Sequence, residues 1–96
     1  MAFYTYILTC HSNTATFIGV TGDLSKRVGR HKSGCGSEYT AKHNINKLVY
    51  FEAHDTLSQA FARERKLRRW RHALKDVLIN DTNPSWSDLN PEASYA

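Results

Sequence analysis

The sequence predicts a small α+β domain in which a three-stranded antiparallel sheet is flanked by helices, in the order β-β-α-β-α-α. Its 96 residues leave room for one domain. Hydrophobic residues are 41% and charged residues 23% of the chain, which is the balance of a globular protein rather than of a disordered chain or a coiled coil. Segments rich in aromatic and β-branched residues alternate with segments of helical periodicity, and this alternation sets the order of the elements.

Three segments have the composition of strands. Residues 3–9, 15–20 and 47–53 are rich in aromatic and β-branched side chains. The polar residues 10–14 between the first two segments form a turn of hairpin length. We therefore expect the first two strands to pair as an antiparallel hairpin.

The first helix is predicted to begin near Asp23, because this carboxylate can cap the free amides of the first turn. We expect it to end by Gly34. The stretch 34–46 opens with Gly-Cys-Gly-Ser and is predicted to be a loop.

A second helical pattern opens on a capping box at residues 56–59 and continues through Asn80, with a break near residues 70–72 that splits it into two helices. An Asn-Pro dipeptide after this pattern ends helical structure. We therefore expect the domain to occupy residues 1–89 and residues 90–96 to be a disordered tail.

Basic residues are concentrated in two short blocks. The chain carries a net charge of +4, and residues 26–32 and 63–75 together hold eleven of its thirteen lysines and arginines. Such blocks favour a polyanion, most simply nucleic acid, although two solvated helix faces would give the same pattern. The candidate phosphate contacts are Lys26, Arg30, Lys66, Arg68, Arg69 and Arg71.

The sequence indicates neither a membrane span nor a secretory signal. No apolar run exceeds four residues, the length of residues 48–51, which is far too short for either. Cys10 and Cys35 cannot build a disulfide scaffold, so we expect free thiols in a reducing compartment and a cytoplasmic protein. We interpret Cys35, between two glycines, as an incidental loop cysteine.

The first predicted helix carries polar residues on its core-facing side. Leu24, Arg27, Val28 and His31 fall at i, i+3, i+4 and i+7 on one stripe. Since the aliphatic residues of this helix lie on that stripe, it must face the sheet. Arg27 and His31 are therefore expected on the sheet side.

The second helical pattern has a carboxylate in its apolar stripe. Leu57, Ala60, Phe61 and Leu67 define the stripe, and Glu64 lies in its middle. Burying a carboxylate costs several kcal/mol unless it is paired or binds a cation. Glu64 is thus either a structural ion pair or a functional group.

Taken together, these residues predict a site above a sheet surface that carries Tyr4 and Tyr6. A proton acceptor, a cation and a carboxylate are what metal-assisted hydrolysis of a phosphodiester requires. The structural alternative is that Glu64 pairs with Arg27 or another base, while His31 is a satisfied semi-buried histidine.

Other site classes fail on spacing. The five histidines and two cysteines lack the pairings of a zinc site. The sequence has no Walker loop, no dinucleotide-binding glycine motif and no serine elbow. We therefore expect no small-molecule cofactor.

A set of short motifs spans nearly the whole chain in a fixed order. They are Tyr4-Thr-Tyr-Ile-Leu, Phe17-Ile-Gly-Val-Thr, Asp23-Leu-x-x-Arg27-x-x-x-His31, Tyr39-Thr, Leu48-Val-Tyr-x-Glu, Ala62-Arg-Glu64-Arg-x-Leu-x-x-Trp70 and Asn83-Pro-x-Trp86-x-Asp-Leu89. Each motif alone is weak, but the ordered set is specific. It resembles the GIY-YIG nuclease family, in particular its small stand-alone single-domain bacterial group.

The resemblance implies an endonuclease that hydrolyses phosphodiester bonds in DNA or RNA with one divalent cation, Mg²⁺ or Mn²⁺, on Glu64. It implies that Tyr6 helps to activate the attacking water and that Arg27 holds the scissile phosphate. His31 would lie beside Tyr6 as its proton partner. The substrate is left open between single- and double-stranded DNA and RNA, and the sequence indicates no oligomeric state.

One motif position departs from the family. Phe17 stands where the second motif has its tyrosine, so the ring is kept and the hydroxyl is lost. A positioned acid–base group contributes about 10²–10⁴-fold to a rate, and a supporting hydroxyl contributes at most that. The alternatives are therefore a catalytically weak or silent nucleic-acid-binding module, or an interaction domain for an acidic partner.

Overall fold

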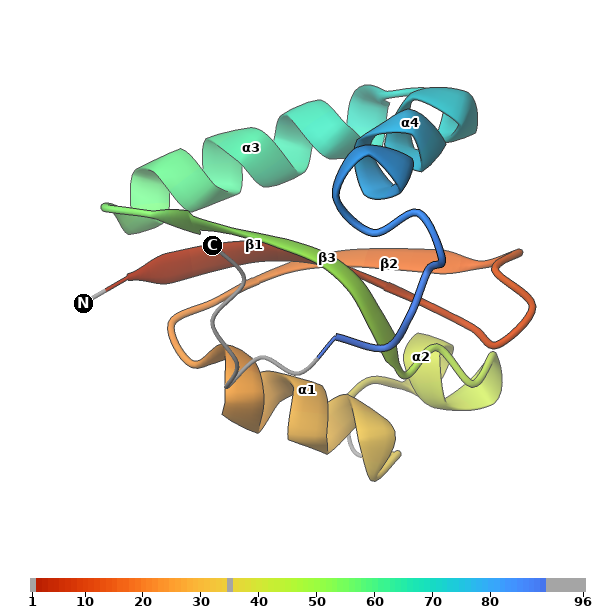
Figure 1. The fold of residues 1–96 in the computed structure, drawn as a ribbon. Coiled ribbons are helices and arrows are strands. Elements are labelled where there is room, and N and C mark those ends of the chain that lie inside the picture. Colours follow the sequence, from red (N-terminus) through yellow and green to blue (C-terminus); the bar gives the residue numbers. More distant parts are fainter. Residues whose placement is uncertain (1, 35, 90–96) are drawn as a thin grey trace.

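A computed structural model describes residues 2–34 and 36–89. Its elements in chain order are β1 (Phe3–Thr9), β2 (Thr16–Thr21), α1 (Leu24–Lys32), α2 (Glu38–Lys42), β3 (Lys47–His54), α3 (Leu57–Arg69) and α4 (His72–Thr82). The strands form one antiparallel sheet in the order β2-β1-β3. Helices α1 and α2 cover one face of this sheet, and α3 and α4 cover the other (Figure 1). The α+β fold predicted from the sequence is confirmed.

Strand β1 separates two small cores because its side chains alternate between the faces of the sheet. The core on the α1 side includes Tyr6, Leu8, Leu24, Val28, Ile45 and Leu48. The core on the α3 side includes Ile7, Ile18, Val49, Tyr50, Leu67 and Ile79. Tyr6 is therefore fully buried in the layer that contains α1, opposite the layer that contains α3.

The helix starts follow the sequence prediction. The Asp23 carboxylate accepts a hydrogen bond from the Lys26 amide at 3.1 Å. Thr56 and Gln59 form the predicted capping box of α3, and the chain breaks at Trp70 before α4 begins. These caps satisfy backbone amides that the first helical turn leaves without partners.

The stretch 34–46 was predicted to be a loop, but it contains the short helix α2. Ser37 caps this helix by accepting a hydrogen bond from the Thr40 amide at 3.1 Å. Thr40 and Ile45 are buried and hold the segment against the sheet. A helix of five residues is too short to show a hydrophobic period.

The predicted apolar stripe of α3 is partly wrong. Ala60 and Leu67, two turns apart, are fully buried, whereas Leu57 and Phe61 are exposed. The Thr5 hydroxyl donates to the Ala60 carbonyl at 2.8 Å, so the small alanine brings the helix close to β1. Phe61 lies one residue, or about 100°, round the helix from this contact.

The turn between β1 and β2 surrounds the thiol of Cys10. The hydroxyls of Ser12 and Thr14 lie 3.3 and 3.4 Å from its sulfur, and the Ala15 amide donates to it at 3.4 Å. These hydrogen bonds lower the pKa of the Cys10 thiol to about 6. Cys10 is a free cysteine, as predicted, and Cys35 lies outside the described residues.

The segment after α4 folds back on β3. The Leu89 amide donates to the Leu48 carbonyl at 2.7 Å, and the Asp88 carboxylate accepts from the Leu48 amide and pairs with Lys32. The predicted tail 90–96 lies outside the described residues. Within the part of the chain that is described, no helix combines the length and the apolar character that crossing a bilayer requires.

Candidate active site at the edge of the sheet

A chain of hydrogen bonds connects Tyr6 on β1 with His31 on α1 and Thr40 on α2. The Tyr6 hydroxyl lies 3.3 Å from Nε2 of His31, and Nδ1 of His31 lies 3.1 Å from the Thr40 hydroxyl. Thr40 donates its own proton to the Ser37 carbonyl at 3.2 Å. This network assigns the proton of the neutral imidazole to Nδ1, which donates to Thr40. Nε2 then accepts a hydrogen bond from Tyr6.

Burial keeps the two members of this pair neutral. Burial is the larger cause that lowers the pKa of His31 below its ordinary value of 6.5, and the positive charge of Arg27 lowers it further. Burial also raises the pKa of the Tyr6 hydroxyl above 10.0; Arg27 opposes this increase and the charge of Glu64 adds to it. At neutral pH His31 therefore presents a lone pair to a protonated tyrosine.

Two glycines make room for the pair. A Cβ atom on Gly19 of β2, which pairs with Tyr6 across the sheet, would lie 2.4 Å from the Tyr6 hydroxyl oxygen. A Cβ atom on Gly36 would lie 2.2 Å from Nδ1 of His31. Both distances are far below a van der Waals contact, so a larger residue at either position would displace the pair.

Arg27 and Glu64 both act on the hydroxyl of Tyr6, from different layers. Arg27 lies half-buried on α1, four residues before His31. Glu64 lies on α3, which packs on the other face of the sheet (Figure 1). The prediction that all site residues lie above one sheet surface is therefore wrong. Strand β2 is one of the two edge strands of the sheet, and the site extends around that edge.

Glu64 has an ion-pair partner, and that partner is Arg68. Their side chains approach to 3.6 Å across one helical turn, with Glu64 17% and Arg68 58% exposed. Among the described residues, no ion pair joins Glu64 to Arg27, which was one structural alternative. The Arg68 guanidinium also donates to the Ile18 carbonyl of β2 at 3.1 Å.

The donor set suits a hard divalent cation that keeps most of its water. Mg²⁺ is commonly bound through one or two carboxylates together with substrate phosphates, and Glu64 is one accessible carboxylate. Within residues 2–34 and 36–89, no cluster of three or more metal-ligating side chains exists. This excludes a closed protein cage in the described part of the chain and fits a site that substrate oxygens complete.

Phe17 packs against the pair without a polar contribution. Its ring centre lies 5.2 Å from that of His31 and 6.3 Å from that of Tyr6. The aromatic contact of the missing tyrosine is thus kept, and its hydroxyl is absent.

The predicted phosphate contacts divide into two groups, one on α1 and one on α3 and just after it. Lys26 and Arg30 are exposed on α1 and line a cavity of about 380 Å³ together with Arg27. The remaining members, on α3 and just after it, are also exposed; they are Lys66, Arg68, Arg69 and Arg71. Within this second group, Arg68 contacts a site residue, Glu64.

Thr40 and Gly36 are the site residues to which sequence reasoning assigned no role. Thr40 was part of a recognised motif, but its contact with His31 depends on the fold of α2. Gly36 acts through the space that it leaves for a ring, which no periodicity reveals. Neither position carries a charge or lies on a helical stripe.

The fold and this tyrosine-centred site define a class of nuclease-like domains. The GIY-YIG catalytic domain family matches residues 2–76. The chain is 35% identical over 78 residues to a UPF0213 protein of Haloquadratum walsbyi, with 81% of this chain and 86% of that protein covered. It is 38% identical over 82 residues to a UPF0213 protein of Syntrophus aciditrophicus, with 84% and 92% covered.

The chain therefore belongs to the GIY-YIG family and, within it, to the UPF0213 group. A solved relative confirms the fold: the solution structure of a UPF0213 protein from Bacillus halodurans superposes with a TM-score of 0.58 at 24% identity and covers 98% of this chain and 99% of the other. Membership indicates a nuclease-like function on nucleic acid, and nucleases of this family generally use a divalent metal.

Proposed function

We propose that this protein is a metal-dependent endonuclease that hydrolyses phosphodiester bonds in DNA, with single-stranded DNA among its substrates. The observation that carries the proposal is the convergence on one hydroxyl, that of Tyr6. His31 hydrogen-bonds to it, and the charges of Arg27 and Glu64 act on it from two layers of the fold. A merely structural tyrosine does not require a cation and a carboxylate whose charges both influence the pKa of its hydroxyl.

The proposed reaction begins with water beside the Tyr6 hydroxyl; because Tyr6 is fully buried, substrate binding must first admit this water between α1 and the sheet. Water attacks the phosphorus and gives its proton to the Tyr6 oxygen, while the Tyr6 proton moves to Nε2 of His31. The bond from phosphorus to the leaving oxygen breaks with its electron pair, and solvent protonates that oxygen. Arg27 binds the non-bridging phosphate oxygens, whose charge it stabilises as the bond forms.

Glu64 is the residue that would hold Mg²⁺ or Mn²⁺. A bound cation neutralises charge that develops on the phosphate in the transition state. The Arg68 guanidinium approaches the Glu64 carboxylate only to 3.6 Å, so a cation could take its place on the carboxylate while Arg68 keeps its hydrogen bond to the Ile18 carbonyl. The cytoplasmic location inferred from the sequence stays a prediction.

The two basic groups beside the site support a polyanionic substrate. Lys26 and Arg30 flank Arg27 on one side, and Arg68 contacts Glu64 on the other. A strand that crosses the edge of the sheet would meet cations before and after the site. Its affinity should fall with salt by about 0.7–0.9 log units per log unit for each phosphate contact.

Phe17 favours a second candidate function, a nucleic-acid-binding module with little or no catalysis. The ring packs against His31 but offers no hydrogen bond to water or phosphate. Binding would then persist through the basic residues, and the cleavage rate would be low or zero.

The test is an incubation of the purified protein with labelled single- and double-stranded DNA and RNA, in Mg²⁺, Mn²⁺ or chelator. We expect cleavage that requires the cation and falls in Tyr6→Phe, which keeps the ring and removes the proton-carrying oxygen. Tyr50→Phe, which removes a tyrosine hydroxyl that donates to Glu52 in the core on the α3 side, is the matched control and should cut normally. Binding without cleavage in any condition would support the module and refute the enzyme.

A further inference from the structure

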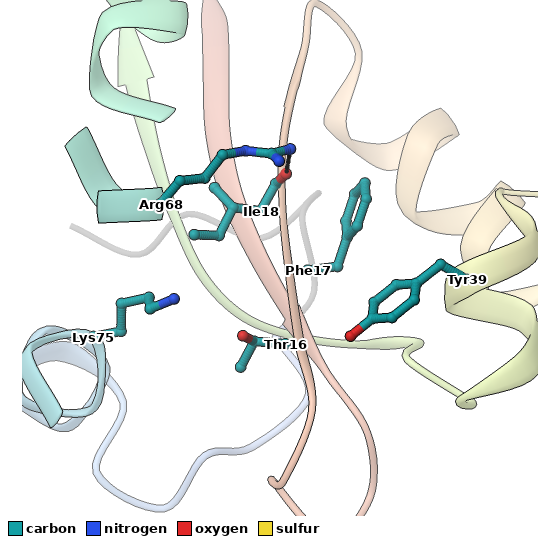
Figure 2. A pocket seen from close by; sticks show the side chains of 6 residues that line it. All are labelled: Thr16, Phe17, Ile18, Tyr39, Arg68 and Lys75. Carbon is teal, nitrogen blue, oxygen red and sulfur yellow. Dashed lines mark hydrogen bonds between the residues drawn. The ribbon is translucent and has the colours of Figure 1, made fainter. Parts of the chain in front are cut away.

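We propose that the pocket beside Phe17 is a subsite for one unpaired nucleotide adjacent to the scissile phosphate. Its base would stack on Tyr39, and its phosphate would lie at Arg68 and Lys75. This inference rests on the proposed nuclease function, because it takes the neighbouring site as the place of cleavage. The pocket has a volume of about 320 Å³ and is lined by Thr16, Phe17, Ile18, Tyr39, Arg68 and Lys75 (Figure 2). That volume is near the lower limit of small-ligand sites, about 300 Å³, and suits a single nucleotide.

The pocket shares walls with the candidate active site. Phe17 forms one wall and also contacts His31, with ring centres 5.2 Å apart. Arg68 forms another wall and lies 3.6 Å from Glu64. A nucleotide in the pocket and a phosphate at the Tyr6 hydroxyl can therefore belong to one strand.

The charge of the pocket selects an anion. Arg68 and Lys75 are its two ionised groups, and its described lining contains no carboxylate. The Ile18 carbonyl accepts a hydrogen bond from Arg68 at 3.1 Å and so fixes that guanidinium at the edge of β2. Figure 2 shows both cations on one side of β2, with Phe17 and Tyr39 on the other. A phosphate is the anion that a nucleic acid would bring to this place.

Tyr39 gives the pocket a stacking surface. It is 49% exposed, so a large part of its side chain is open to solvent. The ring of His43 lies 4.8 Å away at 52° and restricts the orientation of the tyrosine ring. In a duplex the faces of each base are covered by its neighbours, whereas an unpaired base can place a face on Tyr39. The subsite therefore selects unpaired nucleotides.

Binding of a fluorescent oligothymidylate and of a matched duplex, measured by anisotropy in chelator, tests the subsite without cleavage. We expect Tyr39→Ala to weaken single-strand binding by about 5- to 100-fold, the range for loss of one stacked base, and to leave duplex binding unchanged. Tyr39→Phe should bind normally. Lys75→Ala should weaken single-strand binding more than Lys42→Ala, which removes the same charge from an exposed position of α2 outside the pocket. Melting curves establish that each variant is folded.

The outcomes separate the subsite from the nuclease. The subsite would be overturned if Tyr39→Ala weakened the binding of single strand and duplex equally, or weakened neither. Equal effects of the two lysine variants on single-strand binding would also overturn it. If oligothymidylate is still cut in Mg²⁺ under any of these results, the nuclease proposal stands alone. The expected binding pattern without cleavage in either metal would instead retain the subsite and refute the nuclease.

Discussion

Replacing Glu64 by glutamine keeps the shape of the side chain and removes its charge, so it separates a cation-binding role from a structural one. In the folded protein, the carboxylate pairs with Arg68 at 3.6 Å across one helical turn, and the arginine is 58% exposed. An exposed pair with this spacing contributes roughly 0.3–0.5 kcal/mol to the free energy of unfolding. In a domain of this size 1 kcal/mol corresponds to roughly 4–8 °C. We therefore expect the melting temperature of Glu64→Gln to fall by no more than about 4 °C.

The response to metal should change far more than the stability. A cation that binds only the folded state at about a hundred times its Kd adds roughly 2.7 kcal/mol to the free energy of unfolding. We expect Mn²⁺ to raise the melting temperature of the parent protein and to have little effect on Glu64→Gln. Cleavage by this variant should fall by about 10²-fold or more, the cost of losing one charge-stabilising group.

Thermal melts of both proteins with and without Mn²⁺, together with cleavage of labelled DNA, provide the assay. Asp81→Asn is the matched control, because it removes one exposed carboxylate from α4, away from the site residues. A buried structural partner would cost roughly 3–5 kcal/mol when neutralised. A loss of that size combined with an unchanged metal response would remove Glu64 from the site and, with it, most of the case for a nuclease.

Four further experiments test the remaining chemistry. Phe17→Tyr should raise the cleavage rate at unchanged DNA affinity, because a hydroxyl that acts only in the transition state changes kcat; an unchanged or lower rate would mean that the site is arranged around the phenyl ring. Thr40→Val removes the acceptor of the Nδ1 proton of His31 and should slow cleavage by about tenfold or more, since an unpaired buried donor costs about 1–3 kcal/mol. Because the pKa of His31 is lowered in the fold, cleavage should persist below pH 6.5 and fall only when the imidazole becomes protonated. The free energy of unfolding should also decrease with acid in this range, since the unfolded state binds more protons than the folded state. NMR titration of the His31 ring checks both expectations. Alkylation of Cys10 in a Cys35→Ser background should show a midpoint near pH 6, and a midpoint near the ordinary 9.0 would contradict the thiolate environment of the turn.

The strands and capped helices were predictable because their signals are local. Residues 3–9 carry aromatic and β-branched side chains and form β1 at the predicted bounds. The caps at Asp23 and Thr56 follow from the chemistry of single side chains within one turn. Helix α2 escaped prediction because its stability comes from the burial of Thr40 and Ile45 rather than from its own periodicity.

Periodicity also identified which residues face inward without specifying what they face. It predicted His31 on the buried side of its helix, and that side chain is 4% exposed. It placed Leu57 and Phe61 in the stripe of α3 beside Ala60, whereas the fold leaves these two exposed and buries Ala60, whose small side chain allows the closer approach. A helical wheel gives the direction of a side chain relative to its helix, and the choice between the two faces of the sheet is made by tertiary packing.

The position of the site at an edge strand gives Arg68 two functions that reinforce each other. An edge strand exposes backbone groups that can pair with another sheet, and charged side chains along the edge prevent such pairing. Arg68 occupies the Ile18 carbonyl of β2 and places a positive charge beside it. The same guanidinium lies next to Glu64 and lines the pocket beside Phe17. Under the proposed function, the cation that protects the edge against a second sheet would also be where a phosphate binds, so one side chain would serve both purposes. This explains why a residue that is mostly exposed is nevertheless held by two contacts.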